Sequence, residues 1–199
     1  MSSVSPFRPL AQHALAHLDC HVLGTLNPPE VHLTSPALLV MTDLARMPAA
    51  TIAPDAAVED ALQSMVIRGV RLLLVADDDG RVQGMVTAAD LQGERPVVVS
   101  LATGVSRNEL LVQAVMTPLN DLDALTLEQV RHASVGEVVE TLKAFGSTHA
   151  LVVAPDAAGR HSVVGLFSAA QVARQLGMPI QTHEVARTFA QIESLFAHH

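Results

Sequence analysis

Tryptophan and tyrosine are absent from this 199-residue sequence, and phenylalanine occurs only five times, although 49% of the residues are hydrophobic. The core must therefore be built from aliphatic side chains. The single cysteine, Cys20, excludes an internal disulfide and favours a reducing compartment, so a cytoplasmic location is expected. No stretch approaches the roughly 18 uninterrupted apolar residues of a membrane-spanning helix. The N-terminus also lacks the pattern of a signal peptide.

Basic residues are scarce as well. The sequence has 12 Lys and Arg against 20 Asp and Glu, which gives a formal net charge of −8. Nucleic acids and anionic membranes both reward a basic surface. We therefore expect neither as a partner.

Motifs of the common enzyme classes are missing too. The sequence contains no Gly-x-Ser-x-Gly, no His-Glu-x-x-His, no phosphate loop ending in Gly-Lys-Ser/Thr and no Cys-x-x-Cys. Acidic and basic side chains are present but form no recognisable catalytic pattern. The expectation is a protein that is not an enzyme.

What the sequence does contain is an internal repeat. Ala56–Leu62 aligns with Ala133–Val139 at an offset of 133 − 56 = 77, and the alignment continues without a gap to Leu74 and Leu151. The hairpin that follows is longer in the second copy, where Gly165 aligns with Gly84. A Val-Met-Thr sequence precedes each copy. Insertions in loops and apolar matches in the regular elements are typical of a duplicated unit.

Each copy has the pattern of a βαββα unit. In the first copy we expect strands at 51–53, 72–76 and 82–86, a helix at 57–68 that ends at Gly69, and a second helix from Thr87. In the second copy we expect strands at 150–154 and 163–167, a first helix capped by Ser134 and Glu137, and a last helix at 168–176. The strands are apolar on both faces, so each copy needs the other to cover its sheet.

The order of these signals resembles the cystathionine-β-synthase (CBS) domain family. The signals are the Val-Met-Thr lead, the Pro-Asp-x-x-Val helix start, the Gly-Arg hairpin and the closing Gly-h-x-Thr/Ser-x-x-Asp, and they cover roughly residues 37–177. The resemblance implies an α/β (α+β) fold of two pseudo-symmetric βαββα repeats packed sheet to sheet, with added terminal helices. The expected organisation is an N-terminal helix and Pro-containing linker (1–36), CBS repeat 1 (37–95), an inter-repeat linker (96–114), CBS repeat 2 (115–177) and a C-terminal helix (178–199).

The resemblance also implies an adenine-nucleotide ligand, AMP, ADP, ATP or a related adenosyl compound, in the cleft between the repeats. In this family the Thr or Ser contacts phosphate, the Asp holds the ribose hydroxyls, and backbone around the first two strands frames the adenine. The candidate ligand-binding residues are Thr51, Val70, Arg71, Leu72, Gly84, Met85, Thr87, Asp90, His149 and Ser168.

Thr87-Ala88-Ala89-Asp90 has two interpretations that stay open. Thr followed by Asp three residues later is a helix capping box, and it is also the family's ligand motif. In the second copy, Gln171 stands in place of the Asp after Ser168. Gln still caps a helix, but it is a poorer clamp for two vicinal hydroxyls than a carboxylate. Ligand binding is therefore expected mainly at repeat 1, where the start of the helix also offers an anion site and Gly84 permits close approach.

Three histidines precede the repeats. His13, His17 and His21 have helical spacing and lie beside Cys20, which is usable for zinc. The same segment is an ordinary amphipathic helix with histidines on its polar side, so no metal is expected. The sequence thus predicts a regulatory module that forms a homodimer through its CBS faces and terminal helices and acts on an unknown effector protein. The alternative is a ligand-free CBS scaffold for oligomerisation and partner docking.

Overall fold

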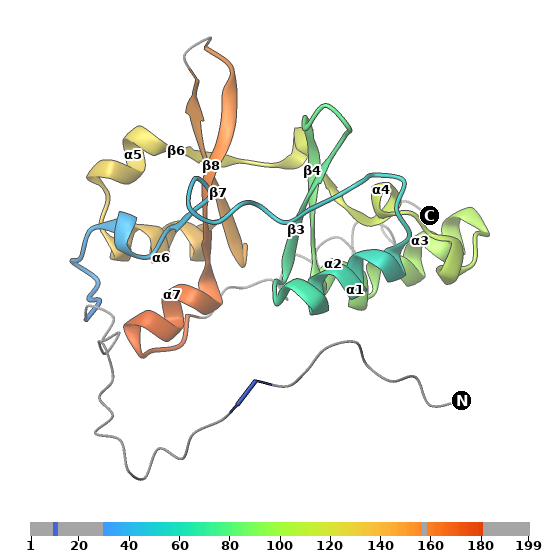
Figure 1. The fold of residues 1–199 in the computed structure, drawn as a ribbon, viewed down its shortest axis with the longest axis horizontal. Coiled ribbons are helices and arrows are strands. Elements are labelled where there is room, and N and C mark those ends of the chain that lie inside the picture. Colours follow the sequence, from blue (N-terminus) through green and yellow to red (C-terminus); the bar gives the residue numbers. More distant parts are fainter. Residues whose placement is uncertain (1–9, 12–29, 157–158, 181–199) are drawn as a thin grey trace, which may run out of the picture. The chain divides into compact units, whose positions relative to one another are not determined.

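The computed structural model describes residues 10–11, 30–156 and 159–180, and every element named below lies in the compact unit Val31–His199. Eight strands form two four-stranded sheets (Figure 1). The first sheet has the order β2 (Thr51–Ile52), β3 (Leu72–Ala76), β4 (Val82–Thr87) and β5 (Thr117–Pro118). The second has the order β1 (Thr42–Asp43), β8 (His161–Ser168), β7 (His149–Pro155) and β6 (Ala124–Thr126). The predicted pair of βαββα copies is confirmed.

Helices connect and cover these strands. They are α1 (Val58–Arg68), α2 (Ala88–Gln92), α3 (Arg95–Thr103), α4 (Val112–Val115), α5 (Leu127–His132), α6 (Val135–Ala144) and α7 (Ala169–Leu176), with 3-10 turns at Ala37–Leu39, Arg107–Glu109 and Leu119–Asp121. The predicted end of α1 is confirmed, because Gly69 follows it with a left-handed φ of 64°. The predicted capping box of α6 is also present, since Ser134 and Glu137 cap each other.

One helix was not foreseen. Arg95 was assigned to the end of repeat 1 and residues 96–99 to the inter-repeat linker, but together they begin α3. Pro96 lies in the first turn of that helix, where its missing N–H costs nothing and its fixed φ favours the helical conformation. Pro96, which was predicted to lie in a linker, therefore lies in the first turn of a helix.

The two sheets exchange their edge strands. β1 comes from the segment before the first copy, yet it pairs with β8 of the second copy. β5 comes from the segment before the second copy and pairs with β4 of the first. The Val-Met-Thr leads therefore do not join the repeats that they precede in the sequence.

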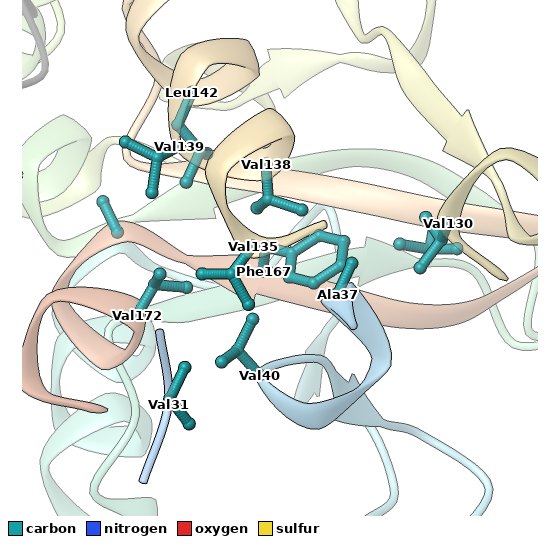
Figure 2. Packing of buried hydrophobic residues seen from close by; sticks show 12 residues of the cluster. Val31, Ala37, Val40, Val130, Val135, Val138, Val139, Leu142, Phe167 and Val172 are labelled. Atoms are coloured by element: carbon teal, nitrogen blue, oxygen red, sulfur yellow. The ribbon is translucent and has the colours of Figure 1, made fainter. Parts of the chain in front are cut away.

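The hydrophobic cores show the same exchange. Val31, Ala37 and Val40 are buried with the second copy, around Phe167 (Figure 2). Leu110, Val112 and Val115 are buried with the first copy, against α1 and β3. The expected aliphatic core is thus observed. Among the largest fully buried side chains of the described residues, Phe167 is aromatic and the others are Leu and Val.

A third cluster joins the two sheets. Leu72 and Leu74 of β3 and Leu151 of β7 are buried together, and Met85 of β4 and Leu166 of β8 pack against them. The predicted packing of one apolar sheet on the other is confirmed by this contact. It places the end of β4 near the start of β7.

Gly84 and Gly165 are equivalent positions that provide a matched test of the exchange. A methyl group on Gly84 would overlap the backbone carbonyl oxygen of Thr117 in β5, whereas one on Gly165 would meet the flexible end of the Met41 side chain. Gly84→Ala should lower the free energy of unfolding by roughly 1–3 kcal/mol, because backbone cannot yield as a methionine can. Gly165→Ala should cost less than about 1 kcal/mol. Urea unfolding measures both, and equal losses would contradict the difference.

Ser134 and Ser168 provide a second matched pair. The Ser134 side chain accepts a hydrogen bond from the Glu137 N–H at the start of α6, whereas Ser168 makes no side-chain cap at the start of α7 among the described residues. Ser134→Ala should lower the free energy of unfolding by about 1 kcal/mol. Ser168→Ala should change it by no more than about 0.5 kcal/mol. A larger loss in thermal unfolding at Ser168 would overturn this assignment of the caps.

Candidate functional site

A cavity of about 840 Å³ lies between the two copies. From the first copy it is lined by the end of β4 and by α2 and α3, and from the second by β6, the end of α6 and the start of β7. Four of the predicted ligand-binding residues line it: Met85, Thr87, Asp90 and His149. The structure therefore brings the first-copy Thr-x-x-Asp motif to a hollow large enough for a small molecule.

Other first-copy residues that were predicted to bind the ligand together with Thr87 and Asp90 do not line the cavity. Thr51, Val70, Arg71 and Leu72 were expected to frame the ligand beside Thr87. The cavity is lined instead by Ala124, Ser147, Thr148 and His149 of the second copy. Ala124 pairs with Leu151 as Thr51 pairs with Leu74, and the other three lie 77 positions after Val70, Arg71 and Leu72. These are the equivalent residues of the other repeat.

Sheet packing explains this substitution of one copy for the other. The end of β4 faces the start of β7 across the contact between the sheets, so the first-copy motif meets the second-copy strands. An alignment of the repeats identifies equivalent residues but does not say which copy supplies them to one cavity. The alignment of the two copies could have identified Ala124, Ser147 and Thr148, because they are the equivalents of the predicted Thr51, Val70 and Arg71. They were not predicted from the sequence.

The other predicted ligand-binding residues of the first copy lie away from the cavity, in the cores or on the surface. Leu72 is buried between the sheets, and Val70 packs against the first core. Arg71 is exposed, as is Thr51, whose carbonyl oxygen accepts a hydrogen bond from Arg68. Gly84 is buried against β5, so the close approach it permits is that of Thr117 rather than of a ligand.

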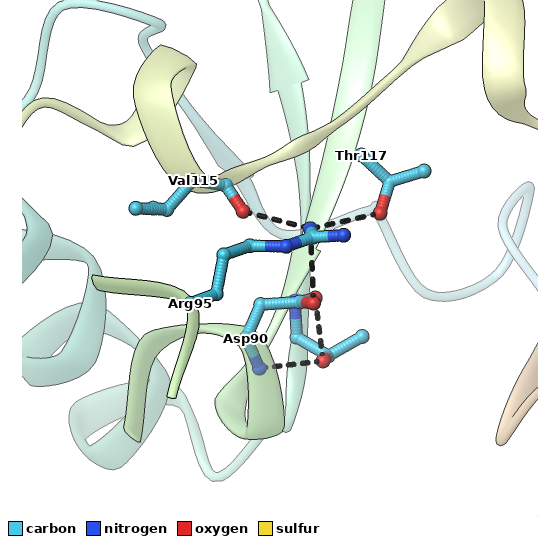
Figure 3. A network of polar contacts seen from close by, with 5 residues as sticks. Asp90, Arg95, Val115 and Thr117 are labelled. Carbon is cyan, nitrogen blue, oxygen red and sulfur yellow. Dashed lines mark hydrogen bonds and ion pairs between the residues drawn. The ribbon is translucent and has the colours of Figure 1, made fainter. Parts of the chain in front are cut away.

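Thr87 and Asp90 form a complete capping box at the start of α2 (Figure 3). The Asp90 Oδ2 atom accepts hydrogen bonds from the Thr87 N–H at 2.8 Å and from the Thr87 hydroxyl at 2.7 Å. The Thr87 Oγ1 atom in turn accepts from the Asp90 N–H at 3.2 Å. Capping thus uses the Thr87 hydroxyl and one oxygen of the Asp90 carboxylate.

The other carboxylate oxygen faces an arginine. The Arg95 Nη1 atom lies 3.1 Å from Asp90 Oδ1, and it also donates to the Val115 carbonyl oxygen at 2.9 Å and to the Thr117 hydroxyl at 3.3 Å (Figure 3). The guanidinium therefore connects Asp90 to β5, the strand exchanged from before the second copy. The sequence analysis missed Arg95 because it assigned the residue to the end of a repeat.

Two features of the site bear on the expected anion binding. The helix after Thr87 has only five residues, so its dipole is a weak attraction for a phosphate. The Thr87 hydroxyl donates its proton to Asp90, so it has none to give to a phosphate oxygen unless the cap opens. Four carboxylates and one guanidinium line the cavity: Asp90, Glu94, Asp121, Asp123 and Arg95.

The second copy is organised differently at the equivalent position. Ser168 was expected to cap α7 with Gln171, but among the described residues its side chain makes no such hydrogen bond. The Gln171 Oε1 atom instead accepts from the Thr42 hydroxyl at 3.3 Å, and Thr42 belongs to the exchanged strand β1. Neither Ser168 nor Gln171 lines the cavity.

His149 contributes a partly buried imidazole at the start of β7. Burial, reinforced by the positive charge of Arg71, lowers the pKa of His149 to about 4, while the Asp90 carboxylate opposes this shift. The ring is therefore neutral at pH 7. One of its nitrogens, Nδ1, lies 3.0 Å from the Thr148 hydroxyl. His149 offers hydrogen bonding to a ligand but no positive charge.

The predicted metal candidates His13, His17 and His21 lie outside the described residues. Within residues 10–11, 30–156 and 159–180, no three His, Cys, Asp or Glu side chains gather closely enough to hold a metal ion. Over the same residues, no helix has the length and apolar character needed to cross a bilayer.

Known proteins resemble this chain in sequence and in fold. Residues 40–95 match the model of the CBS domain. An uncharacterized protein of Methanopyrus kandleri is 32% identical over 66 residues, which are 33% of this chain and 34% of that protein. The match therefore spans about a third of the relative's length.

Solved structures extend the comparison to both copies. An uncharacterized conserved protein from Pyrococcus horikoshii has a TM-score of 0.54 and 23% identity, over 76% of this chain and 99% of its own. A CBS-domain containing protein from Agrobacterium tumefaciens has a TM-score of 0.49 and 21% identity, over 66% and 88%. CBSX2 in complex with AMP has a TM-score of 0.49 and 23% identity, over 70% and 93%.

The family match covers the first copy, and the second copy repeats its sequence pattern and its βαββα fold. The first copy therefore matches the CBS domain over residues 40–95, and the second copy is similar to it in pattern and fold.

Proposed function

We propose that this chain is a non-enzymatic regulatory module that binds an adenine nucleotide or a related adenosyl ligand in the cavity between its CBS repeats. The observation that carries the proposal is the position of Asp90. The carboxylate of the first-copy Thr-x-x-Asp motif, which the family resemblance associates with ribose hydroxyls, lines a cavity of about 840 Å³. That volume lies in the range of small-molecule sites.

The cavity wall suits a nucleoside. Apolar side chains such as Val98, Leu122 and Phe145 line part of it and could cover a purine face, and Ser147, Thr148 and Ala150 supply backbone and hydroxyl groups near the start of β7. The four carboxylates favour ligands with little negative charge near them. Adenosine and S-adenosylmethionine therefore belong among the ligands to test beside AMP, ADP and ATP.

The proposed binding is asymmetric. The equivalent position of Asp90 in the second copy is Gln171, which is hydrogen-bonded to Thr42 and does not line the cavity. We assign one ligand to each chain, at repeat 1. Binding would change the contact between the copies, and an effector protein would respond to that change. The acidic net charge argues against a nucleic acid or a membrane as partner, and we propose a cytoplasmic location.

A ligand-free scaffold is the alternative function. It is favoured by apolar side chains that stay exposed on helices: Val66 and Ile67 of α1 are 80% and 76% exposed, and Leu101 of α3 is 82% exposed. Such side chains suit a homodimer or a docked partner. This alternative predicts a dimer in light scattering that is indifferent to adenosyl ligands.

Asp90→Asn should weaken adenosine binding at least tenfold, because the cap needs the one acceptor oxygen of the neutral amide, which leaves no acceptor for the diol. Isothermal titration calorimetry of the full chain measures this loss, with AMP, ATP and S-adenosylmethionine in parallel. Glu137→Gln is the matched control, since Glu137 holds the same place in the capping box of α6 but does not line the cavity. Absence of binding by the wild-type protein at millimolar ligand would overturn the proposed function.

His149 should make stability depend on pH. Its folded pKa of about 4 is below the ordinary value of 6.5, so the unfolded chain takes up the proton first as the pH falls. Above pH 6.5, His149 is neutral in both the folded and the unfolded chain and does not reduce the free energy of unfolding. As the pH falls toward 4, its protonation in the unfolded chain lowers the free energy of unfolding by up to about 3 kcal/mol. Urea unfolding at intervals between pH 7 and 4 should show a shallower decline for His149→Gln. The exposed His132→Gln should retain the wild-type decline, and an identical decline in all three proteins would contradict this role.

A further inference from the structure

We infer that Arg95 is a latch on the ligand site: it holds the carboxylate of Asp90 that a ribose would use, and it ties that carboxylate to β5. The inference rests on the proposed function and adds its regulation. Its basis is the set of contacts that Arg95 makes with Asp90, Val115 and Thr117 (Figure 3).

The two carboxylate oxygens of Asp90 are not equally available to a ligand. A carboxylate oxygen has two lone pairs that can accept hydrogen bonds. Both lone pairs of Oδ2 are used, by the N–H and the hydroxyl of Thr87. A vicinal diol must therefore bind at Oδ1, and there the Nη1 atom of Arg95 lies at 3.1 Å. A diol that donates both of its hydroxyls to Oδ1 needs both lone pairs of that oxygen, and Arg95 occupies one of them, so the diol and the ion pair compete.

Arg95 also contacts the segment that leads into β5. The same Nη1 atom donates to the Val115 carbonyl oxygen, at the end of α4, and to the Thr117 hydroxyl in β5. Nη1 carries two protons for three acceptors, so its position is a compromise among them. If a ligand takes Oδ1, Arg95 loses its ionic partner and its hold on Val115 and Thr117 is free to change. The ligand site is thereby coupled to the exchanged strand.

The ion pair between Arg95 and Asp90 is of moderate strength. The side chains of Arg95 and Asp90 are 40% and 20% exposed, so the pair is neither a fully solvated surface contact nor a buried one. An ion pair of this exposure shifts an equilibrium by a small factor, roughly two- to fivefold. A ligand can overcome such a latch, and removing the latch should measurably tighten binding.

Adenosine is the decisive probe because it carries the diol but no phosphate that could contact Arg95 directly. Arg95→Met keeps the aliphatic stem and removes the guanidinium. Calorimetric titration should show that Arg95→Met binds adenosine roughly two- to fivefold more tightly than the wild type. The control Arg131→Met removes an arginine that pairs with Glu128 in α5 and does not line the cavity, and its affinity should equal that of the wild type. Equal or weaker binding by Arg95→Met would overturn the latch and leave the proposed function standing.

A second measurement needs no variant of Arg95. Salt screens the Arg95–Asp90 pair but acts little on an uncharged ligand. Wild-type affinity for adenosine should therefore rise as the ionic strength increases from about 0.05 to 0.5 M, a range over which the screening length falls several-fold. A constant or falling affinity would overturn the latch. If adenosine binds neither the wild type nor Arg95→Met, both the latch and the proposed function are wrong.

Discussion

The exchange of edge strands between the two copies is the constraint on which the rest of this structure depends. Each sheet takes one strand from the segment that precedes the other copy, and each core takes apolar side chains from the same segment. Separating the copies would uncover Val112 and Val115 on one side and Ala37 and Val40 on the other, all of which are fully buried. The hydrophobic cost of that exposure fixes the copies relative to each other.

The cavity beside Asp90 follows from this fixed arrangement. Its two halves come from different copies, and neither the first-copy motif nor the second-copy strand starts would form a hollow alone. Arg95 links the cavity to the exchange directly, because it contacts Asp90 on one side and Val115 and Thr117 on the other. A change at the carboxylate is therefore a change at the strand that holds the copies together. This is a physical route by which a small ligand could alter a whole pair of domains.

Sequence reasoning predicted local structure well and the site only in part. Strand β3 was predicted at its observed bounds, and α1 and α6 were identified by the spacing of their apolar residues and by their end signals. These features depend on neighbours in the chain. Thr87 and Asp90 were found by motif, but Ala124, Ser147 and Thr148 were not, because sheet packing between distant segments decides which copy faces them. Arg95 was assigned to the end of a repeat, and nothing in the local sequence indicated its partners Val115 and Thr117, which are about 20 positions away.

Capping alone does not account for the surroundings of Asp90. Three capping boxes occur in the described residues, at Thr87, Thr126 and Ser134. At Thr126 the cap acceptor is the neutral Gln129, so a full charge is not needed to close the box. At Ser134, the Glu137 side chain serves the cap and its pKa is lowered by those hydrogen bonds. Asp90 differs because Arg95, from another helix, forms an ion pair with Oδ1, the carboxylate oxygen that the cap does not use. A charged oxygen that faces a cavity and is held by a partly exposed arginine is poised for exchange of its partner, and a diol is the kind of group that could replace it.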